Sequence, residues 1–135
     1  MEVRTKISAE DFYEMRKSVE WKDISVNQLE KALNNSMIVI GIYEENKIVA
    51  MGRLVGDYSC KGMLTDIIVK PTCQNKGYGK IIVKQILEIA RSNLKEGEKI
   101  DIQGSPTSGN REFYINCGLK YKPEEQDGVY IWLEN

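Results

Sequence analysis

Two stretches near the N-terminus carry apolar residues every three or four positions, and this spacing predicts amphipathic helices. The first covers Ala9–Lys17, with Ser8 as its candidate N-cap. The second is centred on Leu29–Leu33 and has Ser25 or Asn27 as its cap. A connection rich in polar residues separates them, so we expect two short helices packed on a common core.

A third stretch with the same spacing is longer. Its apolar positions are Val83, Ile86, Leu87, Ala90 and Leu94. We expect this helix to begin at Gly79 and to end at Gly97, since glycine is a common helix terminator. A short helix is also predicted at Arg111–Asn116, stopped by Gly118.

Runs of β-branched and other apolar residues predict strands. Met37–Tyr43 and Ile48–Val55 flank the polar turn Glu44–Lys47, which indicates a β-hairpin. The strand Met63–Val69 is expected to end at Pro71, which cannot donate to a ladder. Three features are predicted after the long helix: a strand at Ile100–Ile102, a break at Gly104–Pro106 and a strand at Val129–Leu133. This order predicts one α/β domain over residues 1–135.

Composition narrows the class of protein. The 135 residues include 19 basic and 20 acidic side chains, and this balance makes nucleic acid an unexpected partner. No apolar run approaches the roughly 18 residues of a membrane span, and Met1 is followed by no secretion signal, so we expect a soluble, cytoplasmic protein without a membrane partner. Histidine is absent. The three cysteines are widely spaced, and neither a disulfide framework nor a metal site is expected.

The predicted strand, glycine-bearing loop and long helix follow one another directly, and this arrangement suits an anion. The first N–H groups of a helix lack internal partners, and Gly77 and Gly79 have no side chain to block a diphosphate. Ile82 stands where a dinucleotide-binding loop needs its third glycine, and Ile81 where a P-loop needs Ser or Thr. Glycines in an ordinary turn are the alternative interpretation.

The segment Gln74-Asn75-Lys76-Gly77-Tyr78-Gly79 resembles the acetyl-CoA loop of the GNAT acyltransferases, Gln/Arg-x-x-Gly-x-Gly/Ala. Asp66–Pro71 precedes it as the family's strand would, and Phe113–Leu119 resembles the family's C-terminal Phe-Tyr-x-x-x-Gly-Phe, with leucine in the last place. The resemblance implies a mixed, mostly antiparallel sheet of about six strands, flanked by helices and split between two parallel strands. It also implies acetyl-CoA as cosubstrate.

Site residues follow from the same resemblance. Backbone groups of the strand would bond the pantetheine arm, and the loop would hold the diphosphate. The implied cofactor-binding residues are Ile67, Ile68, Val69, Gln74, Asn75, Lys76, Gly77, Tyr78, Gly79 and Lys80. Tyr114 matches the general acid that protonates the leaving thiolate, although a tyrosine packed in the core is the alternative.

Asp66 interrupts an apolar strand, where a carboxylate is costly unless it is paired or functional. We expect it to act as a base or amine ligand, with a structural hydrogen bond as the alternative. The resemblance places Trp21, Arg53, Asp57 and Tyr58 near the acceptor pocket, with hydrophobic packing at a loop edge as the alternative for Trp21. Cys117 has no histidine to activate it, which favours a buried thiol over a nucleophile.

The expected activity is transfer of an acetyl group from acetyl-CoA to a primary amine, by direct attack of the amine on the thioester. A small-molecule acceptor, held by carboxylates such as Asp57 or Asp66, is favoured over protein N-termini or lysines. A non-catalytic acyl-CoA-binding module and a structural subunit with a vestigial loop are the alternatives. Homodimers are common in the GNAT family, but this sequence carries no independent signal for one.

Overall fold

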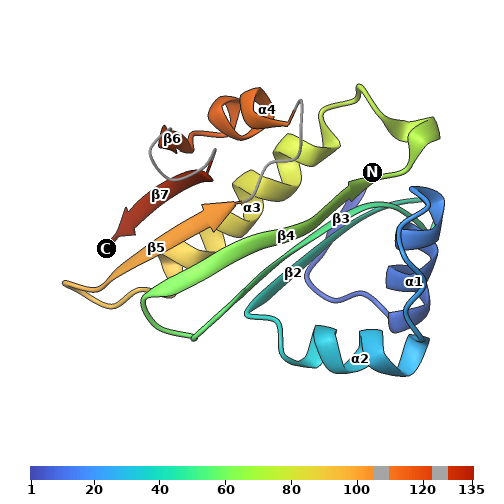
Figure 1. The fold of residues 1–135 in the computed structure, drawn as a ribbon, viewed down its shortest axis with the longest axis horizontal. Coiled ribbons are helices and arrows are strands. Elements are labelled where there is room, and N and C mark those ends of the chain that lie inside the picture. The colour runs from blue at the N-terminus through green and yellow to red at the C-terminus, as the bar shows by residue number, and fades with distance from the viewer. Residues whose placement is uncertain (105–109, 123–127) are drawn as a thin grey trace.

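The computed structural model describes residues 1–104, 110–122 and 128–135, which fold around a seven-stranded sheet (Figure 1). The strand order is β1-β2-β3-β4-β5-β7-β6, and neighbours are antiparallel except for the parallel pair β4 and β5. The strands are β1 (Glu2–Arg4), β2 (Ile38–Glu44), β3 (Lys47–Gly56), β4 (Lys61–Val69), β5 (Lys99–Gly104), β6 (Lys120–Lys122) and β7 (Gly128–Glu134). The helices are α1 (Ala9–Ser18), α2 (Val26–Asn34), the 3-10 turn η1 (Pro71–Cys73), α3 (Tyr78–Ser92) and α4 (Arg111–Asn116).

The predicted hairpin is confirmed as β2 and β3. Glu44 pairs with Lys47, so the turn consists of the two residues between them. These residues, Glu45 and Asn46, have φ angles of 49° and 65°. Two consecutive left-handed residues are typical of the type I′ turn, whose twist matches that of the flanking strands.

Several predicted boundaries differ from the structure. The three-residue edge strands β1 and β6 were not predicted, because each is too short to establish an alternating pattern. Helix α3 ends at Ser92 with Asn93 as its C-cap, and Gly97, with φ of 83°, lies in the turn before β5. Residues 105 and 106 of the predicted Gly104–Pro106 break lie outside the described residues.

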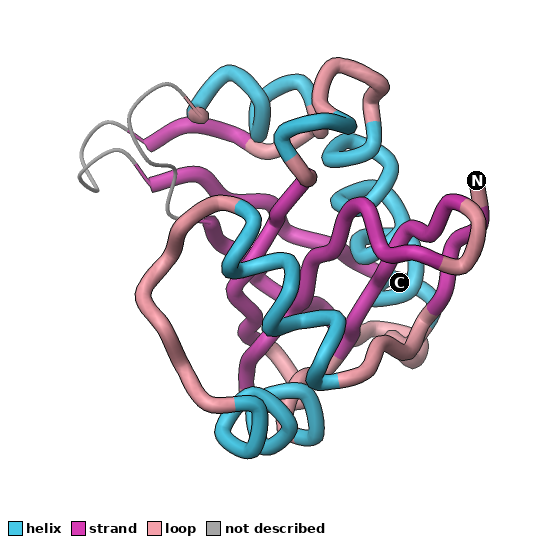
Figure 2. The backbone as a smooth tube through the Cα atoms, turned by 90° about the vertical axis from the view of Figure 1, so that its right-hand side faces the viewer, coloured by secondary structure: helices cyan, strands magenta, loops and turns pink. Residues whose placement is uncertain are grey.

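Helices cover the two faces of the sheet in separate layers (Figure 2). Against one face α3 buries an apolar stripe that includes Ile82, Val83 and Ile86, all fully buried. Against the other face α1 and α2 enclose a smaller core that includes Phe12 and Met15. A long arc joins the end of α1 to the start of α2 and brings Val19 and Trp21 beside the end of β4.

The close approach of α3 to the sheet depends on Gly52 in β3. A Cβ atom there would lie 2.5 Å from Cγ2 of Ile82 and 2.6 Å from Cδ1 of Ile67, so the helix or the strand would have to move. We expect Gly52→Ala to lower the free energy of unfolding by about 1–3 kcal/mol, the usual cost of overpacking. Urea unfolding followed by circular dichroism would measure this, and an unchanged midpoint would show that the packing adjusts freely.

Strand β4 carries one residue more than β3 opposite it. Met51 pairs with Ile68 and Arg53 pairs with Thr65, which leaves two residues of β4 facing Gly52 alone. The first of them, Asp66, has φ of 52°. The result is a β-bulge, which bends its strand and shifts the alternation of side chains by one position. As a consequence Leu64 packs toward α3, whereas Ile68, four residues later, packs toward α1 and α2.

Candidate active site

Helix α3 begins without a side-chain cap. The hydroxyl oxygens of Ser8 and Ser25 accept hydrogen bonds from backbone N–H groups of α1 and α2. At the start of α3 the cap is Gly77, and within the described part of the chain no side chain accepts from the first N–H groups. Those groups also lack partners within the helix. They are therefore free to bind a ligand.

Charges at the start of α3 favour an anionic ligand. The first turn of α1 contains Glu10 and Asp11, which suit the positive end of a helix dipole. The first turn of α3 contains no acidic residue and carries Lys80, a cation that the dipole alone would disfavour. Unpaired N–H groups and an adjacent lysine together are suited to phosphate oxygens.

The two loop glycines have different roles in the geometry. Gly77 has φ of 79°, and a Cβ atom there would meet no atom of the described residues within 4 Å. Asn75, with φ of 69°, is also left-handed, so the loop turns its backbone sharply twice. At Gly79 a Cβ atom would lie 3.1 Å from the ring of Phe113 on α4. Gly77 thus keeps space open at the surface, whereas Gly79 lets α4 approach α3.

Beyond the bulge, β4 separates from β5. The parallel pairing runs from Lys61 opposite Asp101 to Leu64 opposite Gly104 and stops there. Among the described residues, the edge of residues 65–69 on that side has no paired strand. Backbone groups on such an edge are available to pair with an extended ligand.

A cleft of about 550 Å³ joins the loop, this open edge and α4. The predicted site residues that line it are Trp21, Ile67, Ile68, Val69, Gln74, Asn75, Gly77, Tyr78, Gly79, Lys80 and Tyr114. Val19, Asn110 and Phe113 also line it and were not assigned from the sequence. Phe113 belongs to the Phe-Tyr motif, which was the only available signal for it, whereas nothing in the pattern marked the other two.

Tyr114 lies against the sheet at one side of the cleft. Its side chain is buried, its ring is 3.6 Å from the position of a Cβ atom at Gly104, and Phe113 meets it edge to face with 5.2 Å between centroids. Burial, with a smaller contribution from Cys117, raises the pKa of Tyr114 above that of an ordinary tyrosine. The phenol therefore keeps its proton at neutral pH, as a general acid requires.

Tyr78 and Lys76 both contact the same carboxylate on the hairpin. The hydroxyl of Tyr78 donates to Glu44, and Nζ of Lys76 lies 3.6 Å from Oε1 of Glu44. The hydrogen bond to Glu44 raises the pKa of Tyr78. Lys76 is thus directed toward the hairpin and does not line the cleft, so these contacts fasten the loop from behind.

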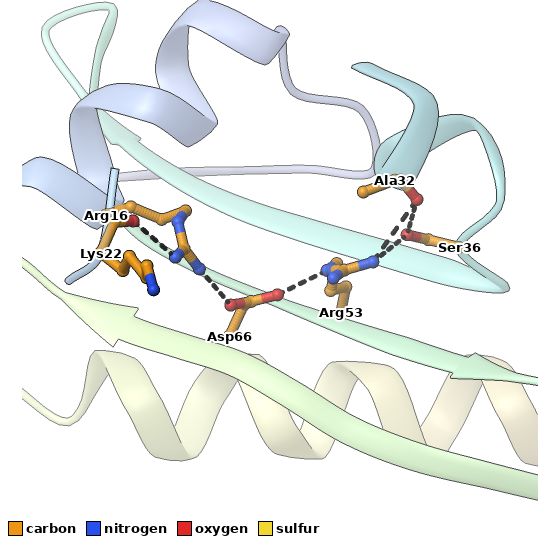
Figure 3. Close-up of polar contacts among 6 residues, drawn as sticks. All are labelled: Arg16, Lys22, Ala32, Ser36, Arg53 and Asp66. Atoms are coloured by element: carbon orange, nitrogen blue, oxygen red, sulfur yellow. Dashed lines mark hydrogen bonds and ion pairs between the residues drawn. The ribbon is translucent and has the colours of Figure 1, made fainter. Parts of the chain in front are cut away.

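Asp66 lies between two arginines on the α1 and α2 side of the sheet (Figure 3). Nε of Arg53 is 2.6 Å from Oδ2, and Nη1 of Arg16 is 3.4 Å from Oδ1. The carboxylate is buried and does not line the cleft. This geometry favours a structural role for Asp66, in which two arginine side chains supply its hydrogen bonds. Arg53 is held in the same way, because its Nη1 also donates to the carbonyl of Ala32 and to Oγ of Ser36.

Asp57 and Tyr58 lie in the β3–β4 turn, at the end of the two strands remote from the cleft (Figure 1). Asp57 accepts from the backbone N–H groups of Ser59, Cys60 and Lys61, and these bonds lower its pKa. Tyr58 is exposed and donates to the carbonyl of Ser36. The expectation that both residues line an acceptor pocket does not fit this placement, because the turn needs Asp57 and the cleft begins beyond the bulge.

Cys117 is buried at the end of α4. Burial raises the pKa of its thiol, and the lysines at 80 and 84 offset this only in part. A protonated, buried thiol is a poor nucleophile. The environment of Cys117 is that of a packing residue.

The architecture is that of known N-acetyltransferases. A protein of unknown function from meticillin-resistant Staphylococcus aureus, described as a probable acetyltransferase, aligns with a TM-score of 0.81 at 21% identity, over 96% of this chain and 97% of that one. Aminoglycoside 6′-N-acetyltransferase, in its crystal structure complexed with coenzyme A, aligns with a TM-score of 0.75 at 15% identity, over 98% and 94% of the two chains.

The chain belongs to the acetyltransferase (GNAT) family, which residues 5–119 match. A relative from Gracilaria tenuistipitata var. liui, the uncharacterized N-acetyltransferase ycf52, is 24% identical over 128 residues, or 92% of this chain and 68% of that protein. The protein is therefore an acyltransferase, and the predicted sheet class is confirmed with seven strands in place of about six. Among the described helices, none is long and apolar enough to cross a membrane.

Proposed function

We propose that this protein transfers an acetyl group from acetyl-CoA to the primary amine of a small, cytoplasmic molecule. The observation that carries the proposal is that one cleft joins the uncapped start of α3, the open edge of residues 67–69 and the buried phenol of Tyr114. These three parts suit, in order, a diphosphate, an extended amide-bearing arm and a leaving thiolate.

The cleft residues fit acetyl-CoA on physical grounds. The N–H groups at Gly77 and Gly79, with Lys80, would bond the diphosphate, while the backbone of residues 67–69 would pair with the amides of the pantetheine arm. A backbone N–H of the same strand would polarise the thioester carbonyl. The surroundings of Gly77 support this assignment, because no described residue lies within 4 Å of its Cβ position and a phosphate group could occupy that space.

Acetyl-CoA supplies the acetyl group as a thioester. The amine nitrogen forms the new bond to the carbonyl carbon, the carbon–sulfur bond breaks, and Tyr114 donates its proton to the departing sulfur. The amine must lose a proton to become nucleophilic. We propose that water carries this proton away, because both oxygens of Asp66 are held by arginines and the carboxylate does not line the cleft.

A small acceptor fits the open part of the cleft. Val19 and Trp21 line the cleft together with residues 67–69 of β4, and the cleft volume of about 550 Å³ suits a small acceptor beside the arm of the cosubstrate. Trp21 is 43% exposed, enough to offer an aromatic face to the acceptor. The net charge of −1 provides no strong field for a polyanion.

The test is thiol release from acetyl-CoA over a panel of primary amines, with lysine-containing peptides and N-terminal peptides as separate arms. We expect turnover with one or more small amines and none above background with peptides. Transfer confined to peptides would overturn the small-molecule assignment. Coenzyme A binding without turnover on any arm would favour a regulatory acyl-CoA-binding module, and the absence of binding would leave a structural role.

A further inference from the structure

One buried carboxylate and two half-buried guanidinium groups form an ion-pair cluster on the α1 and α2 side of the sheet: Arg16 at the end of α1, Asp66 at the bulge of β4 and Arg53 on β3 (Figure 3). Their side chains are 15%, 8% and 16% exposed, respectively. We call this the Arg16–Asp66–Arg53 cluster. Asp66 directly precedes the strand segment that lines the cleft, so the cluster adjoins the segment proposed to hold the cosubstrate.

Each arginine also reaches a second element. Nη2 of Arg16 donates to the carbonyl of Lys22 over 2.9 Å, and its guanidinium lies 5.4 Å from the centroid of the Trp21 ring. Nη1 of Arg53 contacts Oγ of Ser36 at 3.2 Å, at the end of α2. A single carboxylate therefore connects the loop that carries Trp21, the end of α2 and the bulged strand.

The cluster carries local costs that stability alone does not explain. Asp66 has φ of 52°, a left-handed backbone conformation that is energetically unfavourable for residues other than glycine. Nε of Arg16 is buried and has no hydrogen-bond partner among the described residues. Buried ion pairs are often no more stable than apolar residues of similar volume. Backbone strain and unpaired buried groups concentrate at functional sites.

We propose that Arg16, Asp66 and Arg53 are positioning residues that fix the Trp21 wall of the cleft relative to the wall formed by residues 67–69. The catalytic role of this cluster rests on the proposed function, in which an acceptor held against Trp21 approaches a thioester held on the strand. The cluster sets the distance between them. None of the three side chains lines the cleft. The cluster therefore acts by positioning Trp21 and residues 67–69, and it does not touch the reacting atoms.

Two other roles account less well for the cluster. A general base needs a free oxygen facing the acceptor, and both oxygens of Asp66 accept from guanidinium groups. A residue needed only for the left-handed bulge would be served by glycine, which adopts positive φ without strain. Glycine would not hold the two arginines, so Asp66→Gly separates the shape of the bulge from the charge.

The first test observes the Trp21 wall directly and needs no ligand. The chain has two tryptophans, so a Trp132→Phe background leaves Trp21 as the single tryptophan, which can be excited selectively over the tyrosines. Trp132 does not line the cleft. We expect Arg16→Gln to increase the acrylamide quenching of Trp21, because the loop loses both its hydrogen bond and its stacking partner. The matched control is Lys31→Gln on α2, which removes the same charge from an exposed side chain that does not lie beside Trp21 and should leave the quenching unchanged.

Asp66→Gly in the same background should reproduce the increase, and the double variant with Arg16→Gln should add little to either single change. Quenching that is equal in the parent and in folded Arg16→Gln protein would overturn the proposal. Additive effects of the two changes would overturn it as well, because they would mean that Arg16 acts independently of Asp66. Far-UV circular dichroism identifies the folded variants, and Arg16→Gln keeps the tighter Arg53–Asp66 pair if Asp66→Gly fails to fold.

The second test connects the cluster to catalysis. With the amine that the parent protein acetylates fastest, we expect Arg16→Gln to lower kcat/KM for the amine by roughly ten- to a hundredfold, the usual cost of a small misplacement. The Kd for coenzyme A should change by less than about threefold, since the loop and α3 that hold the diphosphate are untouched. An equal loss of coenzyme A affinity would show a general structural defect and contradict a positioning role. A parent protein that binds no coenzyme A would refute the proposed function and leave the quenching result to stand alone.

Discussion

Gly77→Val is expected to abolish the rise in thermal midpoint that coenzyme A produces in the parent protein. A ligand at a hundredfold excess over its Kd stabilises the folded state by about 2.7 kcal/mol, which corresponds to roughly 10 °C for a chain of this size. A valine side chain would occupy the open space at Gly77 and would resist its φ of 79°. Differential scanning fluorimetry with and without coenzyme A measures the shift.

Gly97→Val is the matched control. Gly97 has φ of 83° and likewise has no protein atom within 4 Å of a Cβ position, but it lies in the turn after α3, away from the cleft. Both variants should therefore lose similar intrinsic stability, on the order of 1–3 kcal/mol. Only Gly77→Val should lose the response to coenzyme A. A folded Gly77→Val protein with the parent shift would refute the diphosphate site.

Tyr114→Phe should reduce kcat by roughly ten- to a thousandfold, the contribution of a positioned general acid. The change removes one hydroxyl and keeps the ring that packs against Gly104 and Phe113, so the fold and the coenzyme A affinity should be preserved. Steady-state kinetics with thiol detection, together with calorimetric titration of coenzyme A, separates these effects.

The pH dependence provides the control for the role of Tyr114. Because burial raises the pKa of Tyr114, the acid form persists to a pH above the value of about 10 at which a free tyrosine ionises. Parent activity should therefore show no loss that is attributable to tyrosine ionisation between pH 7 and about 10. If Tyr114→Phe kept full activity, solvent would be the proton donor and Tyr114 a packing residue.

The helices and the hairpin could be predicted because their signals are local. Ser8 and Ser25 cap α1 and α2 as the sequence indicated, and the apolar spacing between Val83 and Ala90 matches the buried face of α3. The glycine loop and its position before a helix were equally visible. A left-handed Gly77 and an open space above it follow from that pattern, and the cleft brings most of the predicted cofactor residues together.

The acceptor side was harder to predict because it depends on contacts between elements far apart in sequence. Asp66 was marked as unusual by its apolar surroundings, but its partners Arg16 and Arg53 lie 50 and 13 residues away. Strict alternation cannot tell which face Asp66 occupies when an extra residue shifts the pattern at that same position. Asp57 was assigned to the acceptor side from the family resemblance, whereas in the structure it lies in the β3–β4 turn and does not line the cleft.

The bulge in β4 also determines which kinds of sequence change this protein can tolerate. The bulge exists because β4 carries one residue more than β3 across Gly52. A substitution at a bulge position changes a side chain but not the number of residues. Most point substitutions should therefore leave the bulge in place. Loss of the codon for Asp66 would leave Ile67 alone opposite Gly52, so the pairing with β3 would run without a break from Thr65 to Ile68 and the bulge would be lost. In this segment the number of residues, more than their identity, determines whether the strand bulges.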